Sequence, residues 1–333
     1  MSDSVDPDMH GANAPQQNEV DPVTVSLESR ARQRGRRKVY LRAFVREPIT
    51  FLACLVLLLM FLIALVGPEI YPHDAAQQSL GNRLQPPGTE AIDQSLPRHY
   101  LGTDPLGRDV VARLLAGARV SLAIGVAGVL VSGVIGISIG LTAGYFRGRV
   151  EDVLMRLTDM QMSFPALILA LFVLFAIGTG FGNLLLVMAI ARWPAYARVA
   201  RSLALKIGGE LYIESARSIG SSPFRIIREH VLPNAMSPLA ILATLELARV
   251  ILFESTLSFL GLGVQPPNTS WGLMINEGRE YLTSAPWMIW LPGLAILVTA
   301  LSANLVASWV QNLSDPLRRA DWLRRGLKDG GAI

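Results

Sequence analysis

Long apolar stretches separated by polar segments dominate the pattern of this chain, and each stretch approaches the roughly 20 residues that a helix needs to cross a bilayer. Six of them predict transmembrane helices, at residues 49–67, 119–142, 152–178, 183–201, 236–262 and 288–311. No charge lies between Met162 and Ala191, but the glycine-rich segment GTGFGN is a strong turn signal that separates the third span from the fourth. The expected fold is an all-α integral membrane protein with six transmembrane helices.

The composition agrees with a membrane protein and disfavours a soluble enzyme. Only 17% of the 333 residues are charged and 51% are hydrophobic, whereas soluble domains average about 25% charged residues. The first apolar stretch has no clear cleavage site after it, which predicts an uncleaved anchor. Cys54 is the single cysteine, so an intrachain disulfide is excluded.

The distribution of basic residues predicts the orientation in the membrane. With the amino terminus inside and six spans, 23 of the 30 Lys and Arg residues lie on the cytoplasmic side, as the positive-inside bias requires. A single helix across 162–191 would instead place the seven basic residues of 192–228 outside. Six spans with both termini cytoplasmic is therefore the better hypothesis.

The two ends of the chain differ in charge. Residues 1–28 contain six acidic residues and no Lys or Arg, which predicts a disordered tail. Residues 29–48 form a basic juxtamembrane segment, for which contact with anionic membrane lipid is expected. No nucleic acid is expected as a partner, because this basic run adjoins a membrane span. Residues 313–333 form a basic tail on the predicted cytoplasmic side.

The main outer loop spans residues 68–118. Its second half leads into GRDVVARLLAGARVSL, where apolar residues recur at helical spacing with arginines between them. This pattern predicts an amphipathic helix at the membrane surface. Residues 119–312 then form the predicted transmembrane core, in which the G-x-x-x-G spacing of Gly136 and Gly140 indicates close helix packing.

The residues of familiar catalytic and metal sites are missing from the pattern. No lysine follows a glycine, so the chain has no P-loop for ATP. The histidines, at positions 10, 73, 99 and 230, are scattered along the sequence, and no metal site is expected. We therefore expect no enzyme activity and no cofactor of the chain's own, and if the chain carries out transport that needs energy, a partner must supply it.

One polar segment between the apolar stretches has unusually regular features: ESARSIGSSPFRIIREHVLPN, residues 214–234. Gly220 predicts a left-handed residue that ends a first short helix. Ser222 and Pro223 predict the N-cap and first residue of a second helix, and the sequence from Leu232 predicts its end. Two interpretations are open: a surface loop on lipid headgroups, or a docking element for a cytosolic protein.

The same segment resembles the EAA loop of permease subunits from bacterial ATP-binding-cassette (ABC) importers. The residues that match the family pattern are Glu214, Ala216, Gly220, Leu232 and Pro233. Ser215 replaces the middle alanine, and His230 stands where an aliphatic residue is usual. The resemblance implies that loop 202–235 docks on an ATPase, with Ala216 and Gly220 permitting close approach and Glu214 and Arg217 making polar contacts.

Further stretches narrow the resemblance. Residues 99–122, 143–171 and 254–275 are similar to the C-type permeases of the dipeptide/oligopeptide/nickel group. This implies the type I ABC importer permease (MetI-like) fold in the cytoplasmic (inner) membrane of a bacterium. The chain would then be a transport subunit and not an enzyme. The implied partners are a sister B-type permease, two ATPase subunits or one fused ATPase that use ATP and Mg²⁺, and an extracytoplasmic substrate-binding protein. The implied cargo is di- or oligopeptides, with nickel or another small solute as the alternative.

Three charged residues lie in the fifth predicted span: Glu246, Arg249 and Glu254. Charges at membrane depth are costly and mark functional candidates, and the spacing of Glu246 and Arg249 permits pairing on one helix face. They either stabilise helix packing and a subunit interface, or line a water-filled pathway that contacts peptide termini. A self-sufficient channel or ion-coupled transporter is disfavoured by the docking-type loop, and a mere membrane anchor by these pore-like charges.

Overall fold

The computed structural model of the protein describes residues 47–91 and 97–314, and within these ranges it is helical without a β-strand. This confirms the all-α prediction for the described part of the chain. The predictions for the tail 1–28, nearly all of the segment 29–48 and nearly all of the tail 313–333 lie outside the described residues.

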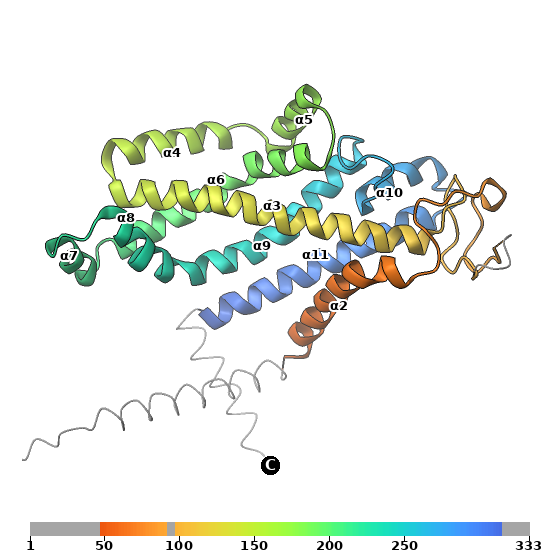
Figure 1. The fold of residues 1–333 in the computed structure, drawn as a ribbon, viewed down its shortest axis with the longest axis horizontal. Coiled ribbons are helices and arrows are strands. Elements are labelled where there is room, and N and C mark those ends of the chain that lie inside the picture. Colours follow the sequence, from red (N-terminus) through yellow and green to blue (C-terminus); the bar gives the residue numbers. More distant parts are fainter. Residues whose placement is uncertain (1–46, 92–96, 315–333) are drawn as a thin grey trace, which may run out of the picture. The chain divides into compact units, whose positions relative to one another are not determined.

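Long helices are joined by short helical turns (Figure 1). In chain order the elements are α2 (Pro48–Ile70), η1 (Leu80–Asn82), α3 (Val110–Phe146), α4 (Gly148–Met162), α5 (Ala166–Ile177), α6 (Phe181–Ile207), α7 (Leu211–Ser218), α8 (Pro223–Ile226), η2 (Ile227–Val231), α9 (Leu232–Phe259), α10 (Trp271–Gly278), η3 (Arg279–Tyr281) and α11 (Trp287–Ser314).

Four helices of the described part are long and apolar enough to cross a membrane: α2, α3, the continuous run from α8 to α9, and α11. They coincide with the first, second, fifth and sixth predicted spans. The pair α4 and α5 makes a fifth candidate if it is counted as one bent span. Helix α6 has 27 residues, about 40 Å of helix, but its basic residues make it less apolar than the other four.

The third predicted span, 152–178, is not one straight helix. Helices α4 and α5 meet at an angle of 87°. The break falls at Ser163–Pro165: the Ser163 hydroxyl donates to the Met160 carbonyl at 2.6 Å, and Pro165 disfavours a helical conformation in the residue before it. The glycine turn after α5 is present as predicted, with positive φ at Gly178 and Gly180.

The predicted surface helix of the outer loop is also not a separate element. Its residues form the first turns of α3, which continues without interruption from Val110 to Phe146. Asp109 caps this helix by accepting a hydrogen bond from the Ala112 amide at 2.9 Å. Arg113 is buried among protein groups rather than exposed to headgroups, so the helix is held inside the protein.

Helices α3 and α6 pack backbone against backbone. Gly136, Gly140 and Gly144 recur every fourth residue along α3, and an added Cβ at each would overlap a carbonyl oxygen of α6; at Gly144 the separation would be 2.6 Å. Small residues allow the close approach that favours helix association in membranes. This geometry confirms the packing role predicted from the spacing of Gly136 and Gly140.

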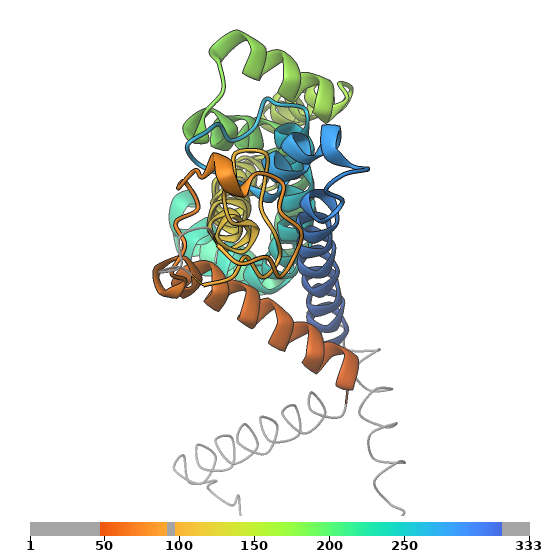
Figure 2. The ribbon, with the colours of Figure 1, turned by 90° about the vertical axis from the view of Figure 1, so that its right-hand side faces the viewer.

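The loops gather at opposite ends of the long helices. Helix α7 lies at one end, whereas α10 and the loop between α2 and α3 lie at the other (Figure 1). Figure 2 views the molecule from this second end, where the loop covers the start of α3. The Trp287 indole donates to the Thr103 carbonyl at 3.2 Å and the Trp271 indole to the Leu114 carbonyl at 3.1 Å, so α10 and α11 hold the loop and α3.

Replacing Gly140 by alanine should destabilise the protein, because the new methyl group overlaps the α6 backbone. Overpacking of this kind costs about 1–3 kcal/mol. Gly293→Ala in α11 is the matched control, since nothing lies within 4 Å of its added Cβ and both substitutions gain the same helix propensity. The measurement is the Tm of the detergent-purified variants; equal values would contradict the packing role.

Candidate functional site

The segment from Gly208 to Asn234, here called the α7–α8 loop, contains the residues that carry the predicted docking role. Helix α7 ends in a Schellman motif: the Gly220 amide donates to the Arg217 carbonyl at 3.0 Å, and the Ser221 amide donates to the Ala216 carbonyl at 3.1 Å. Gly220 has φ = +82°, the left-handed conformation that this motif requires. The predicted helix end at Gly220 is therefore confirmed.

The second helix begins as predicted but does not end as predicted. The Ser222 hydroxyl accepts from the Arg225 amide, and Pro223 occupies the first turn. The expected end at Leu232–Asn234 is wrong, because the chain stays helical from Pro223 to Phe259. The five-residue π turn η2 immediately precedes this point; such a turn widens the helix and accommodates Pro233, which has no amide hydrogen to donate.

One face of the α7–α8 loop is buried against the long helices. Ile213, Ala216, Ile226 and Val231 belong to an apolar cluster. On the long helices the cluster includes Leu141 of α3 and Ala200 and Ala204 of α6. The loop is therefore a packed part of the fold rather than a loose connection.

The other face presents large apolar side chains to the outside. Leu211, Ile219 and Phe224 are 79%, 82% and 73% exposed, and Tyr212 is exposed beside them. A group of exposed apolar side chains at one end of a protein is typical of an interaction surface. The sequence did not predict this role for Leu211 or Ile219. The spacing from Ile213 and Ala216 predicted that Ile219 or Gly220 would continue the same apolar stripe, but Ile219 is exposed.

The residues predicted to form the docking site divide between these two faces. Glu214, Ser215, Arg217 and Gly220 are exposed, whereas Ala216 is buried within its own chain. The Arg217 guanidinium lies 5.0 Å from the centre of the Tyr145 ring, a cation–π distance that anchors α7 to the end of α3.

The departures from the family pattern have local partners. The Ser215 hydroxyl donates to the Leu211 carbonyl at 3.0 Å inside α7, so a serine fits where alanine is usual. The His230 ring packs edge-on against Tyr212, with ring centres 6.3 Å apart. Leu232 packs at the margin of the apolar cluster and Pro233 is exposed.

The predicted pair in the fifth span is present and has a third member. Arg249 donates to the fully buried Glu246 carboxylate at 2.8 Å. Arg192, on α6, donates to the other oxygen of Glu246 at 2.9 Å through its Nε. Sequence reasoning missed Arg192, because 54 residues separate it from Glu246. The three side chains carry a net positive charge and join α6 to α9.

Glu254 lies in a different environment. Its buried carboxylate accepts hydrogen bonds from the hydroxyls of Ser258 at 2.6 Å and Ser121 at 3.2 Å. The Ser121 hydroxyl in turn accepts from the Trp271 amide at 3.3 Å. The structure therefore brings Glu246 and Arg249 together but places Glu254 in a separate network that connects α9, α3 and α10.

A buried ionic cluster holds the opposite end of the molecule. Arg113 contacts Asp104 at 2.7 Å and Glu277 at 2.6 Å. Arg108 contacts the same two acids, and its distance to Glu277 is 3.1 Å. Sequence analysis assigned Arg108 and Arg113 to a surface helix and did not predict Glu277 as their partner. The cluster fixes the loop before α3 to α10.

Substitution of Glu246 by glutamine should destabilise the protein, because Arg192 would then lack its counter-charge in the interior. Breaking a buried ion pair costs about 3–5 kcal/mol. Replacing Glu246 and Arg192 together by methionine should recover part of the loss. Glu214→Gln, at an exposed site, is the control for the Tm measurement; a Glu246→Gln variant as stable as this control would contradict the pairing.

Two family models match this chain. Residues 136–320 match the family model described as binding-protein-dependent transport system inner membrane component, which is more than half of the chain. Residues 37–87 match the N-terminal TM domain of oligopeptide transport permease C. A structure of the MetNI methionine ABC transporter aligns with a TM-score of 0.43 at 21% identity, covering 60% of this chain and 96% of that chain, a score too low to establish a common fold.

Curated relatives align along most of their lengths. The chain is 38% identical over 275 residues to the glutathione transport system permease protein GsiD of Pectobacterium atrosepticum, covering 83% of this chain and 89% of that protein. It is 37% identical to the di/tripeptide transport system permease protein DppC of Pseudomonas aeruginosa (84% and 91% covered). It is 36% identical to the nickel transport system permease protein NikC of Escherichia coli (80% and 93% covered). The chain therefore belongs to the inner-membrane permease family of binding-protein-dependent ABC importers, within the peptide and nickel group.

Proposed function

We propose that this permease carries di- or oligopeptides inward across the cytoplasmic membrane by alternating access, driven by ATP that partner subunits hydrolyse. The observation that carries the proposal is the α7–α8 loop, in which a rigidly capped α7 exposes Leu211, Ile219 and Phe224 beside the exposed Glu214 and Arg217. A separate motor protein would find both apolar and charged contacts on this surface. Two ATPase subunits or one fused ATPase, with their ATP and Mg²⁺, would supply the energy.

The connections of the α7–α8 loop suggest how a displacement of α7 would be transmitted to the membrane-spanning helices. Helix α7 follows α6 after three residues and precedes the continuous helix that includes α9. Its buried residues Ile213 and Ala216 pack on α3 and α6. A displacement of α7 by a closing ATPase pair would therefore move α6 and α9 with it.

A sixth span formed by α6, with both termini cytoplasmic, completes the proposed topology. Three of the four basic residues on α6 have acidic partners: Arg192 pairs with Glu246, Arg201 donates to Glu151 at 2.6 Å, and Arg198 contacts Asp159 at 2.8 Å. Pairing lowers the cost of placing these charges near or within the bilayer. In this orientation the α7–α8 loop faces the cytoplasm, and α10 with the ionic cluster of Arg113 faces the substrate-binding protein.

Arg249 is the residue that we place closest to the transport pathway of the solute. Its side chain is 60% exposed although it lies within a candidate span, and such a charge requires water, a substrate or a protein partner. It could contact the carboxylate of a peptide, or an acidic group of a sister B-type permease. Glu246 would then hold Arg249 in position, and Glu254 would maintain the packing of the same helix.

The cargo is assigned from the relatives' names. Those relatives are named for di/tripeptide, glutathione and nickel transport, and peptide-type cargo is the more frequent among the three. Nickel is the alternative. In either case a substrate-binding protein outside this chain would select the solute.

The decisive experiment reconstitutes this permease with its sister permease, ATPases and binding protein in vesicles. We expect peptide-stimulated ATP hydrolysis and ATP-dependent uptake of labelled peptide. Stimulation by Ni²⁺ and not by peptide would assign the alternative cargo. Uptake by this chain alone, without ATPases, would contradict the importer mechanism.

Gly220→Val should weaken the association with the ATPase or its coupling to transport. Its φ of +82° costs a residue with a Cβ about 1–2 kcal/mol, and more when the side chain is β-branched. Nothing lies within 4 Å of the added Cβ, so conformation rather than space causes the effect. Gly220→Asn is the matched control, because asparagine tolerates the left-handed region.

The measurement for Gly220 is ATPase co-purification together with peptide-stimulated hydrolysis. Both variants should insert into the membrane at wild-type levels. If valine and asparagine behave alike, the shape of the turn does not matter for docking.

A further inference from the structure

Three potential metal ligands meet at the end of the molecule opposite the α7–α8 loop. His73 follows α2, His99 belongs to the loop before α3, and Asp109 is the N-cap of α3. One nitrogen or oxygen atom from each lies within 4.8 Å of the others, and the three residues are 6%, 3% and 2% exposed. The sequence suggested scattered histidines, but folding brings these two together.

The environment of His99 determines which of its nitrogens is free. Its Nδ1 lies 2.9 Å from Oδ2 of Asp109, whose other oxygen accepts from the Ala112 amide. An ionised carboxylate only accepts hydrogen bonds, so the His99 proton resides on Nδ1. The lone pair of the neutral ring is then on Nε2, which is buried and has no hydrogen-bond partner among the described residues.

In His73 the opposite ring nitrogen is hydrogen-bonded. Its Nε2 lies 3.0 Å from the Pro97 carbonyl oxygen, which also only accepts, so Nε2 donates and Nδ1 keeps the lone pair of the neutral ring. The two imidazole rings are 4.9 Å apart between centres. Metal-binding histidines typically donate their second nitrogen to a carboxylate or a backbone carbonyl, and both arrangements occur here.

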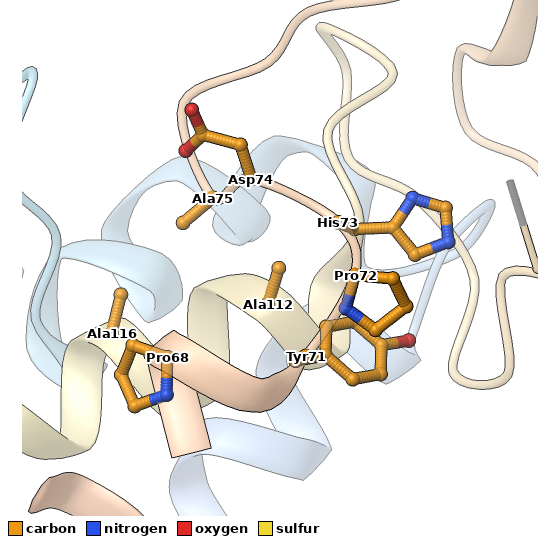
Figure 3. Close-up of a pocket in the computed structure, with 8 residues that line it drawn as sticks. All are labelled: Pro68, Tyr71, Pro72, His73, Asp74, Ala75, Ala112 and Ala116. Carbon is orange, nitrogen blue, oxygen red and sulfur yellow. The ribbon is translucent and has the colours of Figure 1, made fainter. Parts of the chain in front are cut away.

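A cavity lies against the same segment and borders His73, whereas His99 and Asp109 are not among its lining residues. Its volume is about 310 Å³, many times the roughly 30 Å³ that one water occupies in the liquid. Its lining includes Tyr71, His73 and the exposed Asp74. In Figure 3 the His73 imidazole and the Tyr71 hydroxyl lie on one side of the chain, whereas the Asp74 carboxylate points to the other side.

We propose that His73 and His99 bind a divalent transition-metal ion of the Zn²⁺, Ni²⁺ or Cu²⁺ class, with Asp109 orienting His99 and water completing the coordination. Imidazole nitrogens suit these ions, whereas Ca²⁺ and Mg²⁺ require oxygen ligands. Nitrogens on a tetrahedral ion lie about 3.3 Å apart. His99 Nε2 and His73 Nδ1 can each bind an ion while the other nitrogen of the ring keeps its hydrogen bond to Asp109 or to the Pro97 carbonyl.

Such an ion would connect three segments that are distant in sequence. It would join the end of α2, through His73, to the loop at His99 and to the start of α3 through Asp109. A bound ion would therefore stabilise the end that carries α10. This role differs from transport of the ion, because it requires neither a binding protein nor ATP.

The test uses the full-length chain, freed of any affinity tag and treated with EDTA. Titration calorimetry with Zn²⁺ or Ni²⁺ should give one ion per chain, and the absorption spectrum of bound Co²⁺ should indicate nitrogen and oxygen ligands. A Tm that rises with Zn²⁺ concentration should accompany binding. A wild-type protein that binds none of these ions stoichiometrically would overturn the proposal without any variant.

Three substitutions locate the ion. His73→Ala and His99→Ala should each weaken binding at least about 100-fold, whereas Asp109→Asn, which keeps an oxygen for the α3 cap, should weaken it about 10- to 100-fold. The control replaces the two remaining histidines, His10 and His230, by alanine and should leave binding unchanged. Loss of binding in this control alone, or unchanged binding in His73→Ala, would overturn the site.

Discussion

The contact on which the rest of the structure depends is the close approach of α3 and α6. Within a bilayer, apolar burial does not drive helices together, so packing at short range must do so. Gly136, Gly140 and Gly144 provide that packing by admitting the α6 backbone. Because α6 leads almost directly into α7, this contact also determines where the α7–α8 loop lies, and it assembles the surface on which Ile213 and Ala216 pack.

The two helices that flank the α7–α8 loop, α6 and α9, are connected by an ion pair. Glu246 of α9 accepts hydrogen bonds from Arg192 of α6 and from Arg249 of its own helix. A buried carboxylate is stable only when it is paired, and separating α6 from α9 at this level would remove Arg192, one of the two partners of Glu246. Movements that enter through α7 are thus expected to move α6 and α9 as a unit.

The sequence predicted the features that neighbouring residues determine, such as helix caps. It did not predict features that depend on residues far apart in the chain. Gly220, Ser222 and Pro223 were recognisable because caps depend on neighbouring residues. The helix end expected at Leu232 was wrong, since the π turn that accommodates the following proline leaves no composition signal. The length of the apolar stretch likewise predicted a helical segment at 152–178, but it did not predict the bend between α4 and α5.

The missed partners share a single cause: large separation along the chain. Arg192 reaches Glu246 across 54 residues, and Arg108 reaches Glu277 across 169. Only packing brings such groups together, so neither pair could be predicted from spacing.

The two ends of the molecule are built from different interactions, and the difference suits the proposed roles. At the α10 end, Arg113 is buried between Asp104 and Glu277, and removing one member of the cluster of two arginines and two acids would leave an unbalanced charge. At the α7 end, an apolar cluster holds the loop while Ile219 remains exposed. Apolar contacts tolerate small shifts in geometry better than buried ion pairs, whose strength depends on hydrogen-bond distance and angle. A surface that must engage and release a motor is therefore better built from apolar contacts, and a surface that must keep its shape from ionic ones.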